Sequence, residues 1–171
     1  MATGTLVSVE EYLHTSYRPD CDYVDGVVEE RNVGEYEHSS LQMGIGAYFF
    51  YRQKAWNIRV LTEQRVQVKK TRFRIPDLCV ILGRSLQPPI IVEPPLICIE
   101  ILSSEDRMVR LQERIDDYLA FGVPNIWVID PMSRRAFVYT AEGSREAKDG
   151  ILRTQNPELV VPLAEVFESI D

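Results

Sequence analysis

Two acidic residues interrupt apolar runs that are typical of buried β-strands. Asp77 follows Ile75-Pro76 and precedes the run Leu78 to Ile81, and Glu100 lies inside the run Cys98 to Leu102. A charge inside a buried strand costs several kcal/mol unless it is paired, protonated or bound to a metal. Two such carboxylates on neighbouring strands can share one hard divalent cation, with water completing the octahedron that Mg²⁺ prefers. The pattern is equally compatible with two structural ion pairs.

A histidine and a glutamate are further candidates. His38 falls on the same helical stripe as Leu41, Ile45 and Phe49, so its side chain is expected to point inward. Such a histidine is either a hydrogen-bonded core residue or a member of a site. Glu63 is the weaker candidate, because strand alternation places its neighbour, rather than Glu63 itself, on the apolar face.

The elements that must position these residues follow from hydrophobic periodicity and turn signals. Ser8 and Glu11 have the spacing of a capping box, and Asp25-Gly26 lies between β-branched residues, which is typical of a hairpin turn. The segments 58–68 and 73–82 are expected to pair as one antiparallel hairpin around a polar turn. In chain order we expect helix 9–16, hairpin 23–28, helix 37–53, strand 58–68, strand 73–82, strand 96–102, helix 107–121, strand 125–130 and an edge strand 136–139.

The second half of the chain predicts a crossover. Strand 96–102 is almost entirely apolar, as a central strand buried on both faces would be. Helix 107–121, stopped by Gly122, connects it to strand 125–130, so these two strands are expected to be parallel. The fold class is therefore α/β or α+β, with a mixed β-sheet flanked by helices. The chain contains neither G-x-G-x-x-G nor G-x-x-x-x-G-K-[ST], which argues against a bound nucleotide cofactor.

Length and composition predict one domain, residues 1–171, with a substantial core, since 45% of the residues are hydrophobic. Cys21, Cys79 and Cys98 form no C-x-x-C motif, and they are expected to be buried thiols in a reducing cytoplasm. The first residues lack the pattern of a secretory leader, and no apolar run approaches the roughly 18 residues of a membrane helix. We therefore expect a cytoplasmic protein that does not enter a membrane.

The net charge of −7 argues against a general nucleic-acid coat protein, but it is an average over unlike segments. Residues 1–37 hold 2 basic and 9 acidic side chains, residues 38–92 hold 9 and 2, and residues 93–171 hold 8 and 15. The basic middle segment contains Lys69, Lys70, Arg72 and Arg74 close to Asp77. This strip is expected either to contact phosphates or to be a solvated hairpin tip.

Several of these pieces together resemble a known family. They are Tyr23-Val24-Asp25-Gly26, His38-Ser39, Arg74-Ile75-Pro76-Asp77, the run Pro95 to Ser103 around Glu100, and the segment from Tyr118 through Gly122-Val123-Pro124 to Pro131. In this order they resemble the bacterial restriction-endonuclease-like domains of the PD-(D/E)XK nuclease superfamily. The resemblance implies a restriction endonuclease-like core at about 37–140, with Mg²⁺ or Mn²⁺ held by Asp77 and Glu100 for phosphodiester hydrolysis. It also implies that the substrate is DNA and that the protein is a homodimer.

The chain departs from the superfamily pattern at its lysine. The position two residues after Glu100 is Leu102, and the resemblance places the substitute on the following helix at Arg114. An arginine can hold a phosphate in a bidentate contact, but it stays protonated and cannot act as a base. The resemblance also brings His38 near the metal. The first hypothesis is a nuclease with Asp77, Glu100, Arg114 and His38 at its active site. Two other hypotheses remain. They are a catalytically degenerate nuclease fold that binds nucleic acid or protein, and an interaction protein whose acids are merely paired.

Overall fold

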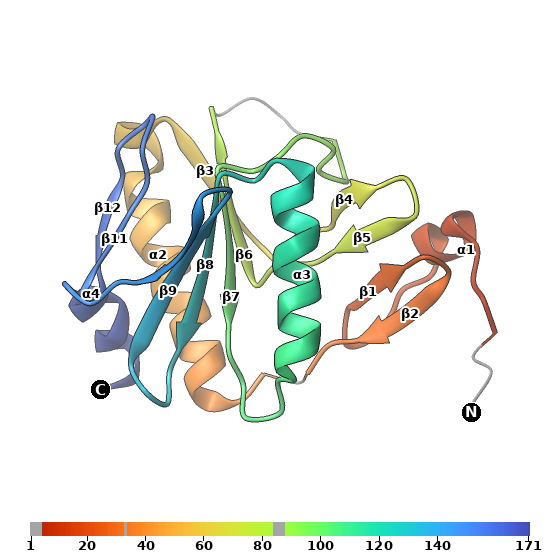
Figure 1. Cartoon of the computed structure of the whole chain (residues 1–171), viewed down its shortest axis with the longest axis horizontal. Coiled ribbons are helices and arrows are strands. Elements are labelled where there is room, and N and C mark those ends of the chain that lie inside the picture. Colours follow the sequence, from red (N-terminus) through yellow and green to blue (C-terminus); the bar gives the residue numbers. More distant parts are fainter. Residues whose placement is uncertain (1–4, 33, 84–87) are drawn as a thin grey trace.

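The computed structural model describes residues 5–32, 34–83 and 88–171, so the segment 1–4, on which the expectation about a leader partly depends, lies outside it. Figure 1 shows two main sheets beside one another, with helices on both faces of the larger one. The elements are α1 (Val9–His14), β1 (Cys21–Val24), β2 (Val27–Glu30), α2 (Tyr36–Trp56), β3 (Ile58–Thr62), β4 (Val66–Lys69), β5 (Arg72–Arg74), β6 (Leu78–Leu82), β7 (Ile97–Ile101), α3 (Met108–Phe121), β8 (Asn125–Asp130), β9 (Arg135–Thr140), β10 (Gly143–Glu146), β11 (Ile151–Arg153), β12 (Val160–Pro162), α4 (Leu163–Phe167) and the 3₁₀ turn η1 (Glu168–Ile170).

The larger sheet has six strands in the order β10-β9-β8-β7-β6-β3. Strands β7 and β8 are parallel and joined by α3, which confirms the expected crossover, and the other neighbours are antiparallel. The strand predicted at 136–139 is confirmed as β9, but its expected position at the edge of the sheet was wrong. Strand β9 pairs with β8 on one side and with β10 on the other, because the turn after Thr140 returns the chain for one more strand. The fold class, a mixed α+β domain, is confirmed.

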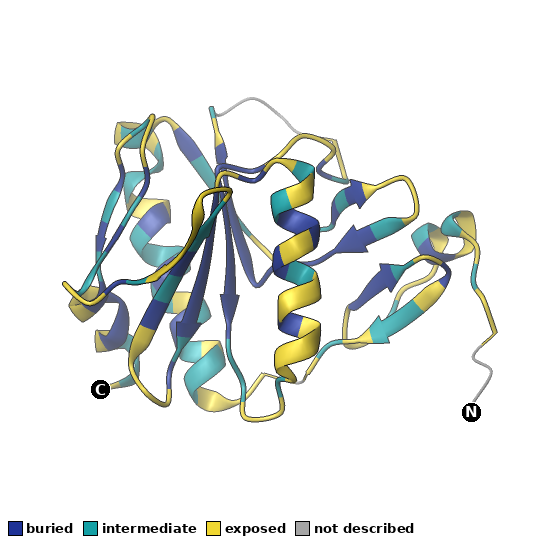
Figure 2. Ribbon diagram, in the orientation of Figure 1, coloured by how far each residue is buried: buried dark blue, intermediate teal, exposed yellow. Residues whose placement is uncertain are grey.

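The two faces of this sheet are covered by different helices (Figures 1 and 2). Alternate residues of β7 show the division, as side chains along a strand point to opposite faces. Ile97, Ile99 and Ile101 join the apolar cluster that contains Leu41, Ile45 and Phe49 of α2, whereas Cys98 joins the cluster that contains Leu111, Ile115 and Tyr118 of α3. The α2 cluster also contains residues of β11, β12 and α4, so the apolar core extends beyond residue 140.

The hairpin expected from strands 58–68 and 73–82 is divided between two sheets. Strand β3 pairs with β6 in the six-stranded sheet, while β4 pairs with β5 in a four-stranded sheet of order β2-β1-β5-β4. The pairing is antiparallel as predicted, but the strands are not continuous. Glu63 takes a left-handed backbone, with φ of 48°, where β3 ends. Pro76, which has no N–H to donate to a ladder, stands between β5 and β6.

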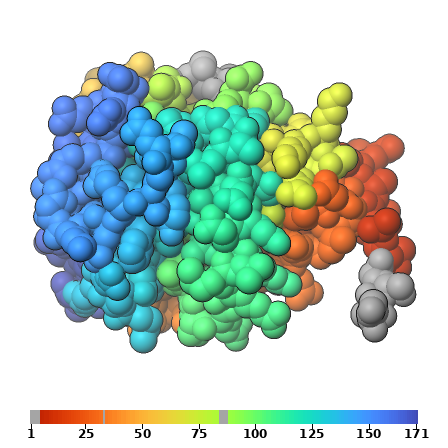
Figure 3. All heavy atoms as spheres, viewed as in Figure 1, coloured from red at the N-terminus to blue at the C-terminus, as the bar shows by residue number. Residues whose placement is uncertain are grey.

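A buried ion cluster fastens the four-stranded sheet to α3. We call it the sheet–helix cluster, and it comprises Asp22, Glu29, Arg72, Arg74 and Asp117. The Arg74 side chain, only 2% exposed, lies 3.0 Å from Asp22, 3.1 Å from Glu29 and 2.8 Å from Asp117. Arg72 contacts Asp117 at 2.9 Å and also binds Asp25 in the β1–β2 turn. In Figure 3 the red, orange and yellow atoms of this region project beside the green atoms of α3.

This cluster corrects part of the expected phosphate-binding strip. Arg74 is enclosed by three carboxylates and is not a surface residue, and Arg72 is committed to Asp25 and Asp117. Asp25 itself is a turn residue, as predicted, with φ of 49°. Only the solvent-exposed Lys69 and Lys70 remain as candidates for contact with a phosphate backbone. Strand alternation could not reveal this, because it does not show which acids face an arginine.

The described helices include none that is long and apolar enough to cross a membrane. Cys21, Cys79 and Cys98 are buried free thiols, as expected. Cys79 and Cys98 lie opposite each other on β6 and β7, and burial raises the pKa of the Cys79 thiol to about 12.

Candidate active site

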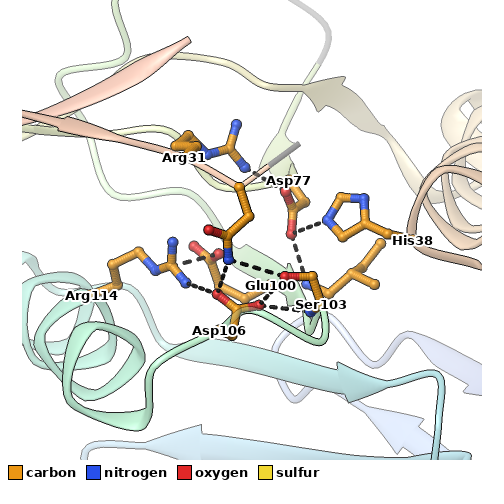
Figure 4. Close-up of a pocket in the computed structure, with 9 residues that line it drawn as sticks. Arg31, His38, Asp77, Glu100, Ser103, Asp106 and Arg114 are labelled. Carbon is orange, nitrogen blue, oxygen red and sulfur yellow. Dashed lines mark hydrogen bonds and ion pairs between the residues drawn. The ribbon is translucent and has the colours of Figure 1, made fainter. Parts of the chain in front are cut away.

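A small polar pocket with a free volume of about 20 Å³, room for about one water molecule, opens where β6 begins and β7 ends. In the pairing of β6 with β7, Leu78 lies opposite Ile99, so one further step places Asp77 opposite Glu100. The two acids that the sequence singles out are thus brought together (Figure 4). The residues that line the pocket are Arg31, Asn32, His38, Asp77, Glu100, Ile101, Ser103, Asp106 and Arg114.

Asp77 is held by three donors from three parts of the chain. Arg31 Nη2 donates to Asp77 Oδ1 in a short contact, the backbone N–H of Ile101 donates to Oδ2 at 2.7 Å, and His38 Nε2 lies 3.2 Å from Oδ2. Burial alone would raise the pKa of Asp77, but His38, Arg31 and the Ile101 N–H outweigh it and lower that pKa. Asp77 is therefore a carboxylate, fixed in one orientation.

Glu100 has a less polar environment. Its Oε1 accepts a hydrogen bond from the Tyr118 hydroxyl at 2.7 Å, and Arg114 Nε lies 3.6 Å from Oε2. Burial raises the pKa of Glu100 to about 7, against the opposing effect of Arg114. The two acids thus differ, since their surroundings lower the pKa of Asp77 and raise the pKa of Glu100.

Helix α2 brings His38 into the pocket by the stripe that the sequence predicts. Leu41, Ile45 and Phe49 of that stripe are buried, and His38 precedes them at the helix start. Burial lowers the pKa of His38, but the hydrogen bond to Asp77 and its charge more than compensate and raise it. His38 Nδ1 is buried and makes no hydrogen bond within the described chain. Nε2 therefore orients Asp77, whereas Nδ1 lies on the side of the ring away from Asp77, toward Gly34.

Sequence reasoning missed the residues that come from connections. Arg31 and Asn32 follow β2, while Ser103 and Asp106 lie between β7 and α3. Asn32 Nδ2 donates to Ser103 Oγ at 3.0 Å and to Asp106 Oδ1 at 3.2 Å, and Arg114 Nη2 donates to the same Asp106 atom at 3.3 Å. The available signals were weak, because a lone arginine after a strand and Ser-x-x-Asp before a helix are both common.

The remaining candidates lie outside the lining. Leu102, at the lysine position of the superfamily pattern, packs against the α3-side apolar cluster. Glu63 is exposed, and its backbone N–H, rather than its side chain, bonds to the Asp77 carbonyl at 3.1 Å. Lys69, Lys70, Arg72 and Arg74 are absent from the pocket lining, because β4 and β5 carry them into the other sheet.

The donor chemistry of the pocket fits a hard divalent cation. Asp77 and Glu100 offer carboxylate oxygens at one place, and Mg²⁺ is commonly held by one or two carboxylates with waters completing its shell. The described residues contain no group of three or more His, Cys, Asp or Glu side chains placed to hold a metal. A cation would therefore depend on these two carboxylates and on water or substrate oxygens. In this structure the Arg31 guanidinium occupies part of the space beside Asp77 that a cation would need.

Comparisons with known proteins find a matching family and a similar solved structure. The model of the family Uma2, described as "Putative restriction endonuclease", matches residues 9–169. Among solved structures, one titled as "a putative nuclease belonging to DUF820 from Anabaena variabilis ATCC 29413" is similar, with a TM-score of 0.83 and 21% identity. The similarity covers 96% of this chain and 99% of that one, so the two share a fold. No curated protein matches the sequence.

Proposed function

The chain belongs to the Uma2 family, and from this premise we propose that it is a metal-dependent nuclease that hydrolyses phosphodiester bonds in DNA. The observation that carries the proposal is the meeting of Asp77 and Glu100 in one polar pocket beside Arg31, His38 and Arg114. Two carboxylates with different pKa values and two guanidinium groups suit a phosphodiester better than a neutral substrate. The buried free thiols suit action in the reducing cytoplasm.

Asp77 and Glu100 would hold a divalent cation, Mg²⁺ or Mn²⁺. When bound, such a cation supplies a water of lowered pKa and offsets charge on the phosphate. Ile101 N–H and His38 fix the Asp77 carboxylate, and Tyr118 fixes Glu100. With their orientations fixed, the two carboxylates would hold the cation at one place.

The two arginines would hold the phosphate. Arg114 is 13% exposed and Arg31 is 11% exposed at the side chain, so each guanidinium reaches the pocket from a largely buried position. A guanidinium donates paired hydrogen bonds to phosphate oxygens and favours the negative charge that builds up on them. His38 Nε2 lies 3.2 Å from Asp77 Oδ2, so His38 would orient the carboxylate that holds the cation.

A second candidate function rests on Leu102 and Arg114. With no lysine at either position, the pocket has two carboxylates that already face guanidinium groups, as a degenerate nuclease that only binds nucleic acid would have. The nuclease and the binding module differ in one measurable respect. A nuclease holds a divalent cation at Asp77 and Glu100, whereas a binding module needs only the arginines and the exposed lysines.

The direct test is cleavage by the purified chain with Mg²⁺ or Mn²⁺. Supercoiled, linear and single-stranded DNA and a structured RNA serve as substrates. We expect cleavage of DNA, lost in Asp77→Asn and Glu100→Gln and retained in the control Glu113→Gln, which alters an exposed acid on α3. Calorimetric titration with Mg²⁺ gives a second readout, since either pocket variant should abolish binding. No cleavage of any substrate and no cation binding would overturn the proposal.

A further pair of variants separates the two functions. Arg114→Lys restores a lysine on the helix, and Leu102→Lys restores it on the strand. If an inert parent gains cleavage in Arg114→Lys, the pocket lacks only its lysine and the binding module is favoured for the natural chain. If the parent cleaves and Arg114→Lys leaves the rate within a few-fold, the nuclease is favoured, with Arg114 holding phosphate.

A further inference from the structure

The outer face of α2 carries an apolar stripe that no part of the described chain covers. Tyr36, Met43, Phe50 and Tyr51 are 74%, 74%, 62% and 82% exposed, respectively. The outer side of a surface helix normally carries charged and polar side chains, so such a run of large apolar residues indicates a contact surface. We define the α2 outer stripe as Tyr36, Ser40, Met43, Ala47, Phe50 and Lys54, with Tyr51 beside it.

The charged residues of α2 lie away from the middle of this stripe. Arg52 turns to the other flank, where it stacks 3.5 Å over the Tyr48 ring and lies 3.7 Å from Glu165 of α4. That flank is already occupied, because η1 packs so closely on Gly44 that a Cβ there would lie 2.6 Å from Ser169. Glu37 stands in the first turn of α2 and Lys54 in the last. The centre of the stripe is therefore uncharged.

The spacing of the stripe matches a second copy of itself. Its residues recur at intervals of four and three, which is the pattern of a helix seam that packs against another helix. The positions of the stripe residues in the sequence are symmetric about position 45. In an antiparallel pair of α2 helices, residue 43 would lie opposite residue 47, residue 40 opposite 50 and residue 36 opposite 54. Each large side chain in the middle then meets a small one, Met43 against Ala47 and Phe50 against Ser40.

Charge selects the antiparallel arrangement. Two parallel α2 helices would place Lys54 against Lys54 and Glu37 beside Glu37, and like charges in contact oppose association. Antiparallel helices place the acidic first turn of one copy at the basic last turn of the other. The macrodipoles of the two helices then also oppose each other, which is favourable.

The area is sufficient for a specific contact. The 21 residues of α2 span about 30 Å, and covering four large exposed side chains removes on the order of 500 Å² per copy. The neighbouring small residues and the ends of the helix bring this toward the roughly 800 Å² per partner of a standard interface.

We propose that the α2 outer stripe is a homodimer interface in which two α2 helices pack antiparallel about a twofold axis near Ile45. The stripe and His38 lie on different sides of α2, since His38 turns toward Asp77. The two pockets of the dimer therefore stay open, and the proposal does not depend on the function assigned to them.

The test is the mass of the protein in solution. Sedimentation equilibrium should give twice the chain mass of 19.7 kDa at micromolar concentration. Met43→Glu should raise the dissociation constant of the dimer by at least about tenfold. Met132→Glu is the matched control, because Met132 is 76% exposed in the β8–β9 turn, away from α2, and it should leave the constant unchanged. Circular dichroism verifies that both variants are folded.

Cross-linking tests the register. Met43→Cys protein is mixed with Ala47→Cys protein and oxidised, and the mixture should give more cross-linked dimer than either protein alone, since the natural cysteines are buried. A wild-type chain that is monomeric up to on the order of 100 μM, or a dimer that Met43→Glu leaves intact, would overturn the proposal. Cross-linking of Met43→Cys with itself, as fast as in the mixture, would overturn the antiparallel register.

Discussion

Two groups of buried arginines and carboxylates each include a residue of α3, and they differ in how completely their charges are enclosed. In the sheet–helix cluster, Arg74 is surrounded by Asp22, Glu29 and Asp117 at 2.8 to 3.1 Å. In the pocket, Arg31 and Arg114 each face the acids from one side only, and the pocket opens on solvent beside them. The first group joins the four-stranded sheet to α3, whereas the second leaves part of its polar surface open to solvent.

The difference shows what distinguishes a structural ion cluster from a candidate site. A buried charge is tolerated when enough partners surround it, and removing one partner of an enclosed pair is strongly destabilising. Where the enclosure is incomplete, as in the pocket, a molecule from solvent can supply a missing contact. Burial of the acid does not distinguish them, since Asp22 and Asp117 are as buried as Asp77.

The largest effect is expected from Arg74→Ala. It leaves Asp22 and Asp117 buried without their central cation, and the free energy of unfolding should fall by about 3–5 kcal/mol. Urea unfolding followed by circular dichroism measures this. Arg74→Lys serves as the matched variant and should lose less, because it keeps the charge but not the branched donors. If Arg74→Ala lowered the unfolding free energy by less than Arg31→Ala does, the proposed difference between the sheet–helix cluster and the pocket would be contradicted.

Arg31→Ala should cost about 2 kcal/mol of unfolding free energy, the worth of one hydrogen bond to a charged group. Asp77 keeps the Ile101 N–H and His38, so the loss is partial. On the proposed function, the variant should also bind Mg²⁺ about tenfold more tightly, because the guanidinium no longer competes for Asp77. Titration calorimetry measures the affinity, with Arg110→Ala as the exposed arginine control. Unchanged or weaker cation binding would contradict the competition.

Tyr118→Phe should cost about 1 kcal/mol of unfolding free energy, because it removes the hydroxyl that donates to Glu100 and leaves the ring in place. Thermal unfolding measures the loss. Tyr139→Phe, a partly exposed tyrosine of β9, is the control and should change little. Equal losses of unfolding free energy in the two variants would show that the Tyr118–Glu100 hydrogen bond contributes no more to stability than the hydrogen bond of a surface tyrosine with water.

The smallest effect is expected from Arg135→Ala. Arg135 makes two contacts of 2.7 Å with Glu146 across β9 and β10, but its side chain is half exposed. Exposed pairs contribute little to stability because water and ions screen their charges, and added salt should reduce the contribution further. Unfolding at low and high salt measures both. A loss of unfolding free energy close to that of Arg74→Ala would show that enclosure of the charges does not determine how much an ion pair stabilises the fold.

The elements that repeat a local pattern were predictable from the sequence. The apolar stripe of α2, the buried run of β7 and the stop of α3 at Gly122 are all local signals, and the crossover between β7 and β8 follows from them. The division of the hairpin between two sheets was not predictable by alternation, because the left-handed turn at Glu63 carries an ordinary residue.

The candidate site likewise contains residues that the sequence predicts and residues that it does not. Asp77 and Glu100 were recognisable because an acid in an apolar strand is conspicuous, and His38 because it continues a stripe. Arg31, Asn32 and Asp106 were not, since they come from connections whose path depends on tertiary contacts. Arg74 was misread as a surface cation, because its three carboxylate partners lie more than 40 residues away in sequence.

Asp117 and Tyr118 are neighbours on α3, yet Asp117 binds Arg74 and Tyr118 binds Glu100. Each residue of an α-helix advances about 100° around its axis, so inserting or deleting one residue before this pair would turn both away from their partners. In evolutionary terms, the length of α3 upstream of Asp117 is constrained twice, by the fold and by the pocket. Length variation among relatives should therefore be confined to connections such as the turn between β9 and β10.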